Sequence, residues 1–165
     1  MRIAALIIST VLAATSALAV EVPLTTPVSG VVQTVLVKQG QSVKKGQVLL
    51  SLDDSIYQAR VAEAAAGASR LQAEMAEADK DLKRAKELYD RAVSSTTEYD
   101  QAKLRFARAD GLYREAQAKL SIAKKNLEYS TLRAPFNGVV SKRLAEPGMV
   151  VSTELQPATL IILSK

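Results

Sequence analysis

The chain contains no histidine, cysteine or tryptophan, and it has only seven glycines and five prolines in 165 residues. Without histidine and cysteine it lacks the commonest metal ligand, the imidazole acid–base and the thiolate nucleophile, and no disulfide can form. We therefore expect no catalytic residue, no metal site and no bound cofactor. The composition indicates a protein that is not an enzyme.

Neither positive nor negative charge is concentrated in one segment of the chain. The 22 lysines and arginines exceed the 17 aspartates and glutamates, giving a formal charge of +5, but the two signs alternate along the central third of the chain. Mixed charges of this kind are typical of a solvated helix surface, whereas a nucleic-acid site needs a basic patch. The sequence therefore predicts no nucleic-acid partner.

Long apolar runs are absent except at the start of the chain. Arg2 precedes an apolar run over 3–14, and Ala17 and Ala19 form the small-x-small pattern of a signal peptidase site. The run is shorter than the ~20 apolar residues of a membrane-spanning helix, which disfavours an uncleaved anchor. We predict a signal peptide over 1–19, cleaved before Val20, and export to the periplasm.

A repeat joins the two ends of the chain, with its copies 108 positions apart. The first copy contains Pro27, Gly30, Val31, Val32, Gly40, Val43 and Leu52, which recur as Pro135, Gly138, Val139, Val140, Gly148, Val151 and Leu160. Each copy reads as short apolar strands separated by Pro and Gly turns. We expect segments 20–54 and 129–165 to be the two halves of one small β-domain.

The segment between the halves, 55–128, is charged and rich in alanine. Apolar residues recur there at alternating steps of four and three, the signature of a coiled coil. The first series is Tyr57, Val61, Ala64, Ala68, Leu71, Met75, Ala78, Leu82, Ala85, Tyr89 and Ala92, and the second is Tyr99, Ala102, Phe106, Ala109, Tyr113, Ala116, Leu120, Ala123 and Leu127. Two arms joined by a short tip, at about 93–97, must form an antiparallel hairpin.

The expected register of this hairpin places large residues opposite alanine. Level pairs near the tip are Ala92 with Tyr99, Tyr89 with Ala102, and Ala85 with Phe106. Such complementarity fills the interface between the arms at nearly constant volume.

Capping residues agree with the expected ends of the arms. Ser95 and Glu98 have the spacing of a capping box at the start of the second arm. Asp53, Asp54 and Ser55 offer capping oxygens before the first.

The halves resemble a known fold. The stretch from Pro27 to Leu49 is similar to the lipoyl or biotinyl carrier domain, but the place of the modified lysine holds Asp53, Asp54 and Ser55. We therefore expect no covalent lipoyl or biotin, which disfavours a cofactor-carrier subunit. With the insertion and the second half, the chain resembles the periplasmic adaptors, or membrane fusion proteins, of tripartite efflux pumps. The resemblance implies an α+β fold: a lipoyl-like (barrel-sandwich hybrid) β-domain split by a long antiparallel coiled-coil hairpin.

Adaptors that engage an outer-membrane channel carry an Arg, a Leu four residues later and a Ser seven residues after that. Arg84, Leu88 and Ser95 match this spacing, and the resemblance implies that they dock the hairpin tip on the channel. Each also has a purely structural interpretation. Ser95 could serve only as a helix cap, Leu88 could broaden the apolar interface, and Arg84 could pair with Glu87 or Asp81.

The family resemblance also implies the remaining functional expectations. They are an inner-membrane transporter of the proton-driven RND type as partner, self-association into a hexamer, and export of small molecules. Family members usually continue into a β-barrel domain, so the chain reads as a shortened form, either a minimal adaptor or an incomplete one. Two alternatives stay open: a self-associating structural protein of the envelope, and an adaptor of an ABC-type or type I secretion system.

Overall fold

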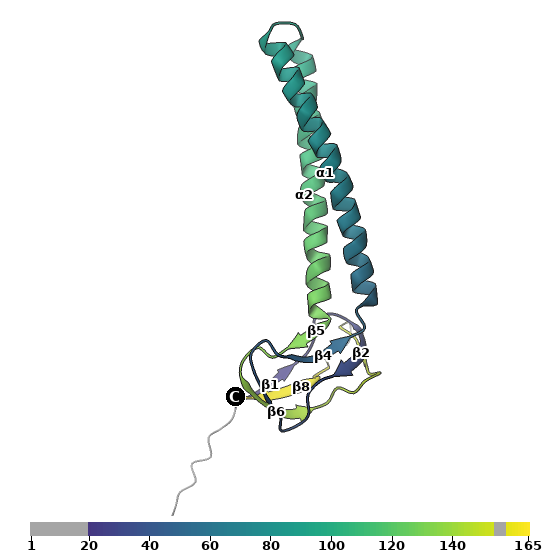
Figure 1. The fold of residues 1–165 in the computed structure, drawn as a ribbon, viewed down its shortest axis with the longest axis vertical. Helices are drawn as coiled ribbons and strands as arrows, with labels where there is room; N and C mark the ends of the chain where they lie inside the picture. Colours follow the sequence, from purple (N-terminus) through teal and green to yellow (C-terminus); the bar gives the residue numbers. More distant parts are fainter. Residues whose placement is uncertain (1–19, 154–157) are drawn as a thin grey trace, which may run out of the picture.

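The computed structural model describes residues 20–153 and 158–165, so the predicted signal peptide lies outside the described residues. A small β-domain sits at one end, and two long helices project from it side by side (Figure 1). Among the described residues, no helix combines the length and the apolar character needed to cross a bilayer. The predicted fold class is confirmed: a barrel-sandwich domain is interrupted by a helical hairpin.

The hairpin consists of α1, Ser55–Asp90, and α2, Thr96–Tyr129. Its interface follows the predicted spacing. Tyr57 and Ala68 are buried in α1, as are Ala102 and Ala116 in α2, and the other predicted interface residues up to Ala85 and in α2 are half-buried. Small side chains at the buried positions let the two helices approach closely. The hairpin is therefore held by one narrow seam, with both outer faces in solvent.

The structure corrects the pairing predicted for the end of this seam. Ala92 lies outside α1, is exposed and has a φ of 55°, so it cannot pair with Tyr99. Tyr89, 40% exposed, instead stacks on the Tyr99 ring, with the ring centroids 5.3 Å apart. The cause is a left-handed turn that ends α1 at Asp90, two residues before the last predicted interface position.

That turn has the hydrogen bonds of a Schellman motif. The amide of Ala92 donates to the Tyr89 carbonyl at 2.9 Å, and the amide of Val93 donates to the Leu88 carbonyl at 2.9 Å. Glycine usually occupies the left-handed position, since an L-residue is disfavoured there by roughly 1–2 kcal/mol. Because an alanine occupies this position, the sequence did not predict the left-handed turn.

The β-domain contains two four-stranded antiparallel sheets. The first has the order β1 (Glu21–Leu24), β8 (Ile161–Ser164), β6 (Gly138–Arg143) and β3 (Ser42–Val43). The second has the order β5 (Thr131–Arg133), β4 (Val48–Leu52), β2 (Gly30–Val35) and β7 (Val150–Val151). Each sheet takes strands from both halves of the chain, so neither half is a sheet by itself.

The sequence repeat appears as a two-fold correspondence in this β-domain. Gly30 pairs with Val151, and in the equivalent place Val43 pairs with Gly138. Between the sheets lies one apolar core of Val, Leu, Ile and Ala side chains. Its buried members are Val28, Val32, Val37, Val43, Leu49, Leu50, Leu52, Tyr57, Ala134, Val140, Ala145, Val151, Leu160, Ile161 and Leu163.

Specific hydrogen bonds fix the hairpin to the β-domain. The hydroxyl of Tyr57 in α1 donates to the Ser29 carbonyl at 2.6 Å, and its ring belongs to the core of the β-domain. At the other helix, the hydroxyl of Thr26 donates to the Tyr129 carbonyl at 2.9 Å. Both helices are thus anchored at the base, which gives the projecting hairpin a defined direction.

The start of α1 differs in detail from the predicted cap. Asp54 is the N-cap residue, but its side chain makes no capping bond to the helix backbone. Asp53 accepts from the Ser55 amide at 3.0 Å and from the Ser55 hydroxyl at 2.7 Å, and these hydrogen bonds lower the pKa of its carboxyl. The carboxylate one residue earlier therefore orders the turn into α1.

Candidate functional site

The residues singled out by the sequence lie together at the end of the hairpin remote from the β-domain (Figure 1). Arg84 and Leu88 are one turn apart near the end of α1, and Ser95 is the N-cap of α2. The Arg84 side chain is 70% exposed and Leu88 is 39% exposed. Both flank the seam, because each directly precedes a seam residue, Ala85 or Tyr89.

Arg84 takes one of its two predicted ion-pair partners. Its Nη1 lies 3.3 Å from Oδ1 of Asp81, and no bond to Glu87 is formed. The pair is exposed and three residues apart on one helix, a geometry that contributes only a few tenths of a kcal/mol. Arg84 is therefore weakly held and can exchange its partner for one on another molecule.

Ser95 forms the predicted capping box. Its hydroxyl accepts from the Glu98 amide at 3.3 Å, and the Ser95 amide donates to Oε2 of Glu98 at 3.1 Å. The cap is a structural role that the sequence predicted.

A depression of about 350 Å³ lies between the two helices at this end, and we call it the tip notch. Its lining residues are Asp81, Arg84, Ala85, Leu88, Ser94, Glu98 and Arg105. Two predicted residues, Arg84 and Leu88, line the notch, whereas Ser95 does not. Ser94 and Arg105 do line it and were missed by the sequence analysis. Arg105 directly precedes the seam residue Phe106, as Arg84 precedes Ala85, so its position relative to the seam was a signal that could have identified it.

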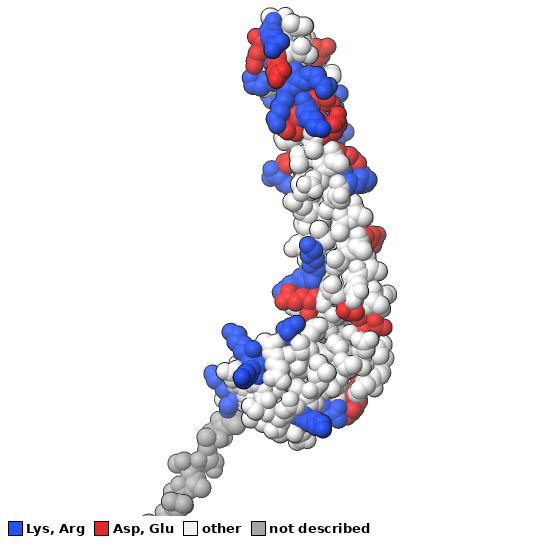
Figure 2. Space-filling view, viewed as in Figure 1, with Lys and Arg blue, Asp and Glu red and all other residues white. Residues whose placement is uncertain are grey.

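Side chains of both signs crowd the tip half of the hairpin, while the half nearer the β-domain shows a broad uncharged area on the face in view (Figure 2). Most of the charges pair along one helix, as in Lys83 with Asp79 and Lys86 with Asp90, each at 2.6 Å. Arg91, Arg105 and Arg108 form no ion pair with any described residue. Near the tip, the unpaired charge is therefore mainly basic, with three arginines against Glu87, whose carboxylate forms neither an ion pair nor a hydrogen bond with a described residue.

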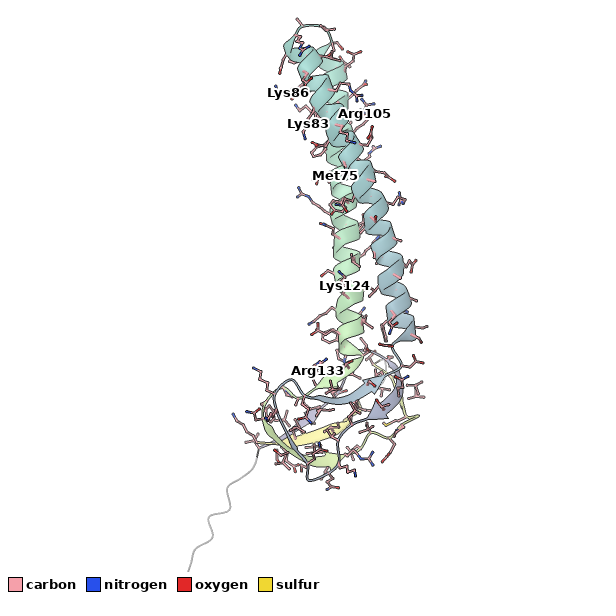
Figure 3. The ribbon with its side chains drawn as sticks, viewed as in Figure 1. Met75, Lys83, Lys86, Arg105, Lys124 and Arg133 are labelled. Atoms are coloured by element: carbon pink, nitrogen blue, oxygen red, sulfur yellow. The ribbon has the colours of Figure 1, made fainter. Side chains whose placement is uncertain are left out.

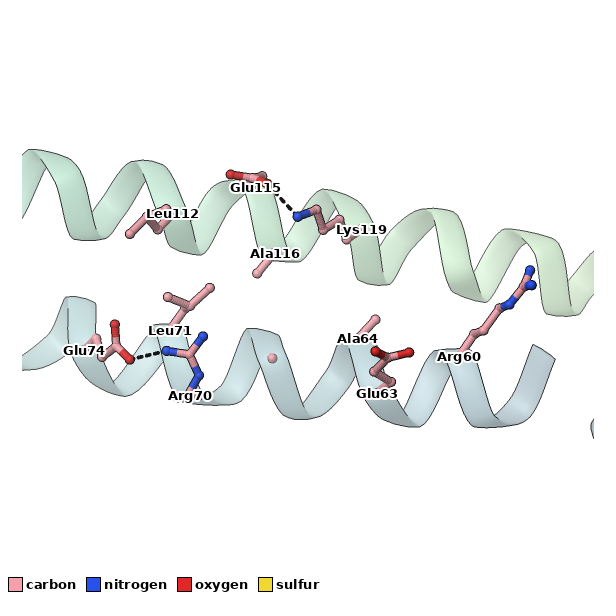
Figure 4. A pocket seen from close by; sticks show the side chains of 11 residues that line it. Arg60, Glu63, Ala64, Arg70, Leu71, Glu74, Leu112, Glu115, Ala116 and Lys119 are labelled. Carbon is pink, nitrogen blue, oxygen red and sulfur yellow. Dashed lines mark hydrogen bonds and ion pairs between the residues drawn. The ribbon is translucent and has the colours of Figure 1, made fainter. Parts of the chain in front are cut away.

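A second depression, about 620 Å³, lies lower on the hairpin (Figure 4). Leu71 and Leu112 contribute its apolar surface, and Gly67 leaves it open, since a Cβ there would meet nothing within 4 Å. Lys119 bonds Glu115 at 2.6 Å on one rim and lowers the pKa of that carboxyl. Among the described residues there is no cluster of three or more metal-ligating side chains.

The role of Ser95 as a cap can be separated from a role in docking. Replacing Ser95 with Ala removes the bond to the Glu98 amide, and we expect a loss of about 1 kcal/mol in the free energy of unfolding. Replacing it with Asp keeps a capping oxygen, so the loss should be within a few tenths of a kcal/mol. Urea denaturation of the purified variants measures both values. Equal losses for Ala and Asp would contradict the capping role.

Comparisons with known proteins agree with the observed fold and identify relatives of the chain. Residues 20–160 match the CzcB-like, barrel-sandwich hybrid domain. The efflux pump periplasmic linker BepD of Brucella suis biovar 1 is 30% identical over 125 residues, which cover 74% of this chain and 31% of that protein. The multidrug export protein AcrE of Escherichia coli is 32% identical over 125 residues, which cover 76% and 32%. The chain spans about a third of the length of these curated relatives.

Solved structures share the fold. MacA from Actinobacillus actinomycetemcomitans superposes with a TM-score of 0.74 at 22% identity, over 86% of this chain and 48% of that one. A MacA-MexA chimeric protein containing the Pseudomonas aeruginosa MexA alpha-hairpin domain gives a TM-score of 0.62 at 28% identity, over 87% and 46%. In both comparisons the shared part includes most of the described residues.

Proposed function

The chain belongs to the membrane fusion protein family with a CzcB-like, barrel-sandwich hybrid domain, and we propose that it is a periplasmic adaptor of a tripartite efflux pump. In this proposal the hairpin tip docks on an outer-membrane channel, and the β-domain faces an inner-membrane transporter of the RND type. The names of the relatives, which are efflux pump linkers and multidrug export proteins, support export of small molecules. The chain itself performs no chemistry.

The observation that carries the proposal is the tip notch at the free end of the hairpin. A 36-residue helix extends about 54 Å at ~1.5 Å per residue, so the notch is held far from the β-domain. At that distance the hairpin presents a weakly paired Arg84 and a half-exposed Leu88. A charged donor beside a small apolar contact is a combination suited to a protein partner. The geometry supports bridging between two proteins.

The β-domain supplies surface for contacts at the other end. Leu36 is 59% exposed and Leu144, its counterpart in the repeat, is 50% exposed. Exposed leucines on a small domain favour a protein contact there, either with the transporter or with a neighbouring copy. In the proposed assembly, six copies stand side by side as a funnel, and the transporter provides the energy. The adaptor connects the two membrane proteins and seals the path between them.

A second candidate, compatible with the surface of the hairpin, is a self-associating envelope protein without a channel. The lower depression on the hairpin exposes Leu112 and leaves the surface beside Gly67 open, so a helix of another copy could pack there. Such packing occurs in both candidates, since adaptors are also expected to stand side by side. An adaptor of an ABC-type or type I secretion system would share every feature described here except its transporter.

Photocrosslinking in cells tests the proposal. A photoreactive residue at Val93, which is 71% exposed in the tip loop, leaves Arg84, Leu88 and Ser95 unchanged. We expect crosslinks to an outer-membrane channel protein, identified by mass spectrometry of the crosslinked peptides. A matched probe at Ile122, which is 62% exposed and far from the tip on α2, should give no channel crosslink. Crosslinks from Val93 only to other copies of the chain would overturn the adaptor proposal in favour of the structural one.

A further inference from the structure

Two polar groups in the tip notch have no partner within the described chain. The carboxylates of the notch are engaged, since Asp81 bonds Arg84 and Glu98 bonds the Ser95 amide. Arg105, in contrast, makes no hydrogen bond or ion pair with a described residue. The hydroxyl oxygen of Ser94 is inaccessible to solvent and also has no hydrogen-bond partner. The notch therefore contains two hydrogen-bond donors without an acceptor, the Ser94 hydroxyl of the tip loop and the Arg105 guanidinium of α2.

A buried hydroxyl without a partner is uncommon, because burial removes its hydrogen bonds to water without replacing them. Ser94 is held in this state by the turn that ends α1, where its amide lies 3.3 Å from the Leu88 carbonyl. The loop backbone thus places the hydroxyl at the wall of the notch. An acceptor brought by a partner would satisfy it once a rotation of the Ser94 side chain turns the hydroxyl toward the notch.

Arg105 stands across the notch from Arg84. Each arginine directly precedes a seam residue of its own helix, so the two flank the same side of the seam from opposite helices. Figure 3 shows Arg105 on the side of the hairpin away from Lys83 and Lys86, which belong to the other face. Leu88 and Ala85 form the apolar part of the notch. The candidate docking surface therefore spans both helices, beyond the three residues that the spacing identified.

We propose that Arg105 and Ser94 are specificity-determining residues of the docking site, and that the notch receives a carboxylate side chain on a loop of the partner channel. This inference rests on the docking function proposed above. The guanidinium of Arg105 can bind a carboxylate through two parallel hydrogen bonds, and the Ser94 hydroxyl can donate another. Leu88 packs against apolar atoms of the same loop.

The other charges of the notch restrict this ligand to a single negative charge. With Asp81 paired to Arg84, Arg105 is the one cation of the notch without a partner among the described residues, so one carboxylate neutralises it, whereas a phosphate group with two charges would leave a negative charge beside Asp81 and Glu98. A loop with an Asp or Glu beside a small apolar residue matches the two arginines, the hydroxyl and the leucine.

The test compares charge reversals on α2 by the yield of channel crosslinks from the probe at Val93. We expect Arg105→Glu to lower the yield at least tenfold, with partial recovery in Arg105→Lys. The control is Arg108→Glu, which reverses another unpaired arginine one turn away that does not line the notch, and its yield should stay within twofold of the unsubstituted chain. An equal fall in both variants would show a diffuse charge effect and would overturn the proposal.

The crosslinked channel peptide should contain an Asp or Glu, and changing that residue to Arg should restore crosslinking to the Arg105→Glu chain. A peptide without a carboxylate, or no restoration, would overturn the carboxylate assignment. An unchanged yield for Arg105→Glu, together with loss in an Arg84→Asp chain, would overturn this inference and leave the docking function standing. If the unsubstituted chain gave no channel crosslink, both this inference and the proposed docking function would be overturned.

Ser94→Ala provides a separate readout. The change deletes a buried hydroxyl that has no partner, so the melting temperature of the purified chain should not fall. The crosslink yield should fall severalfold because a donor to the bound loop is lost. A lower melting temperature with an unchanged yield would instead assign Ser94 a structural role and overturn its place in the docking site.

Discussion

A chain carrying Arg84→Asp and Ser95→Arg together should fail to support export in a strain that depends on it. The first change reverses the charge of the weakly paired guanidinium and places it beside Asp81, so repulsion replaces attraction. The second places a long cation at the start of α2 and removes its cap. Disrupting a charged contact at an interface costs about 2–5 kcal/mol, or roughly 30- to 4,000-fold in affinity.

The effect of this double variant is multiplied if several copies dock together, since each copy carries the same two changes. The measurement is the minimum inhibitory concentration of exported compounds in a strain whose only copy is the variant. We expect it to fall to the value of the deletion strain. A matched control, Lys80→Asp with Ser69→Arg, changes the net charge equally at exposed positions away from the tip notch and should retain export. Full export by the tip variant would contradict docking at the tip.

Gly138→Ala should be the most damaging single-methyl change in the β-domain. A Cβ at position 138 would fall well inside van der Waals contact of the Ser164 carbonyl oxygen, and it would also crowd the Phe136 ring at 3.2 Å. The carbonyl belongs to β8, the neighbour of β6, so relief requires the two strands to separate. Overpacking against a backbone costs about 3 kcal/mol or more, a large share of the stability of a small domain.

The repeat supplies a matched control for this change. Gly30 is the counterpart of Gly138, but a Cβ there would meet a side-chain atom, Cδ1 of Leu52, at 3.3 Å. Because a leucine can adjust its rotamer, Gly30→Ala should cost about 1 kcal/mol or less. Urea denaturation of both variants, monitored by tyrosine fluorescence, compares their free energies of unfolding. Similar losses would show that the strands can move apart easily, contrary to the expected asymmetry.

The helical hairpin could be predicted because its apolar residues recur at a regular spacing along each helix. A spacing of 3.5 residues identifies a seam, and the structure buries or half-buries every predicted seam residue from Tyr57 to Ala85 and from Tyr99 to Leu127. The capping box of Ser95 with Glu98 was visible for the same reason, because the four residues involved are consecutive. The split β-domain could be predicted from its repeat.

The geometry of the tip could not be predicted in the same way. Ala92 adopts a left-handed conformation that sequence patterns associate with glycine, and this turn brings Tyr89 onto Tyr99. The turn also buries the Ser94 hydroxyl, an effect of the loop conformation that no spacing reports. The notch itself depends on which residues of α1 and α2 lie level, so it emerges only when the two helices are assembled.

The sharing of each sheet between the two halves of the chain has a consequence for how the protein folds. β1 begins at Glu21 and pairs with Ser164 of β8, so the first sheet cannot be completed until β8, more than 130 residues later, is available. The hairpin, in contrast, makes mostly contacts between neighbouring turns, which form quickly. Once α1 and α2 are packed together, the ends of the 78-residue connection between β4 and β5 are already adjacent, and little loop-closure entropy remains to be lost. The coiled coil would then act as a folding template for the domain that carries it.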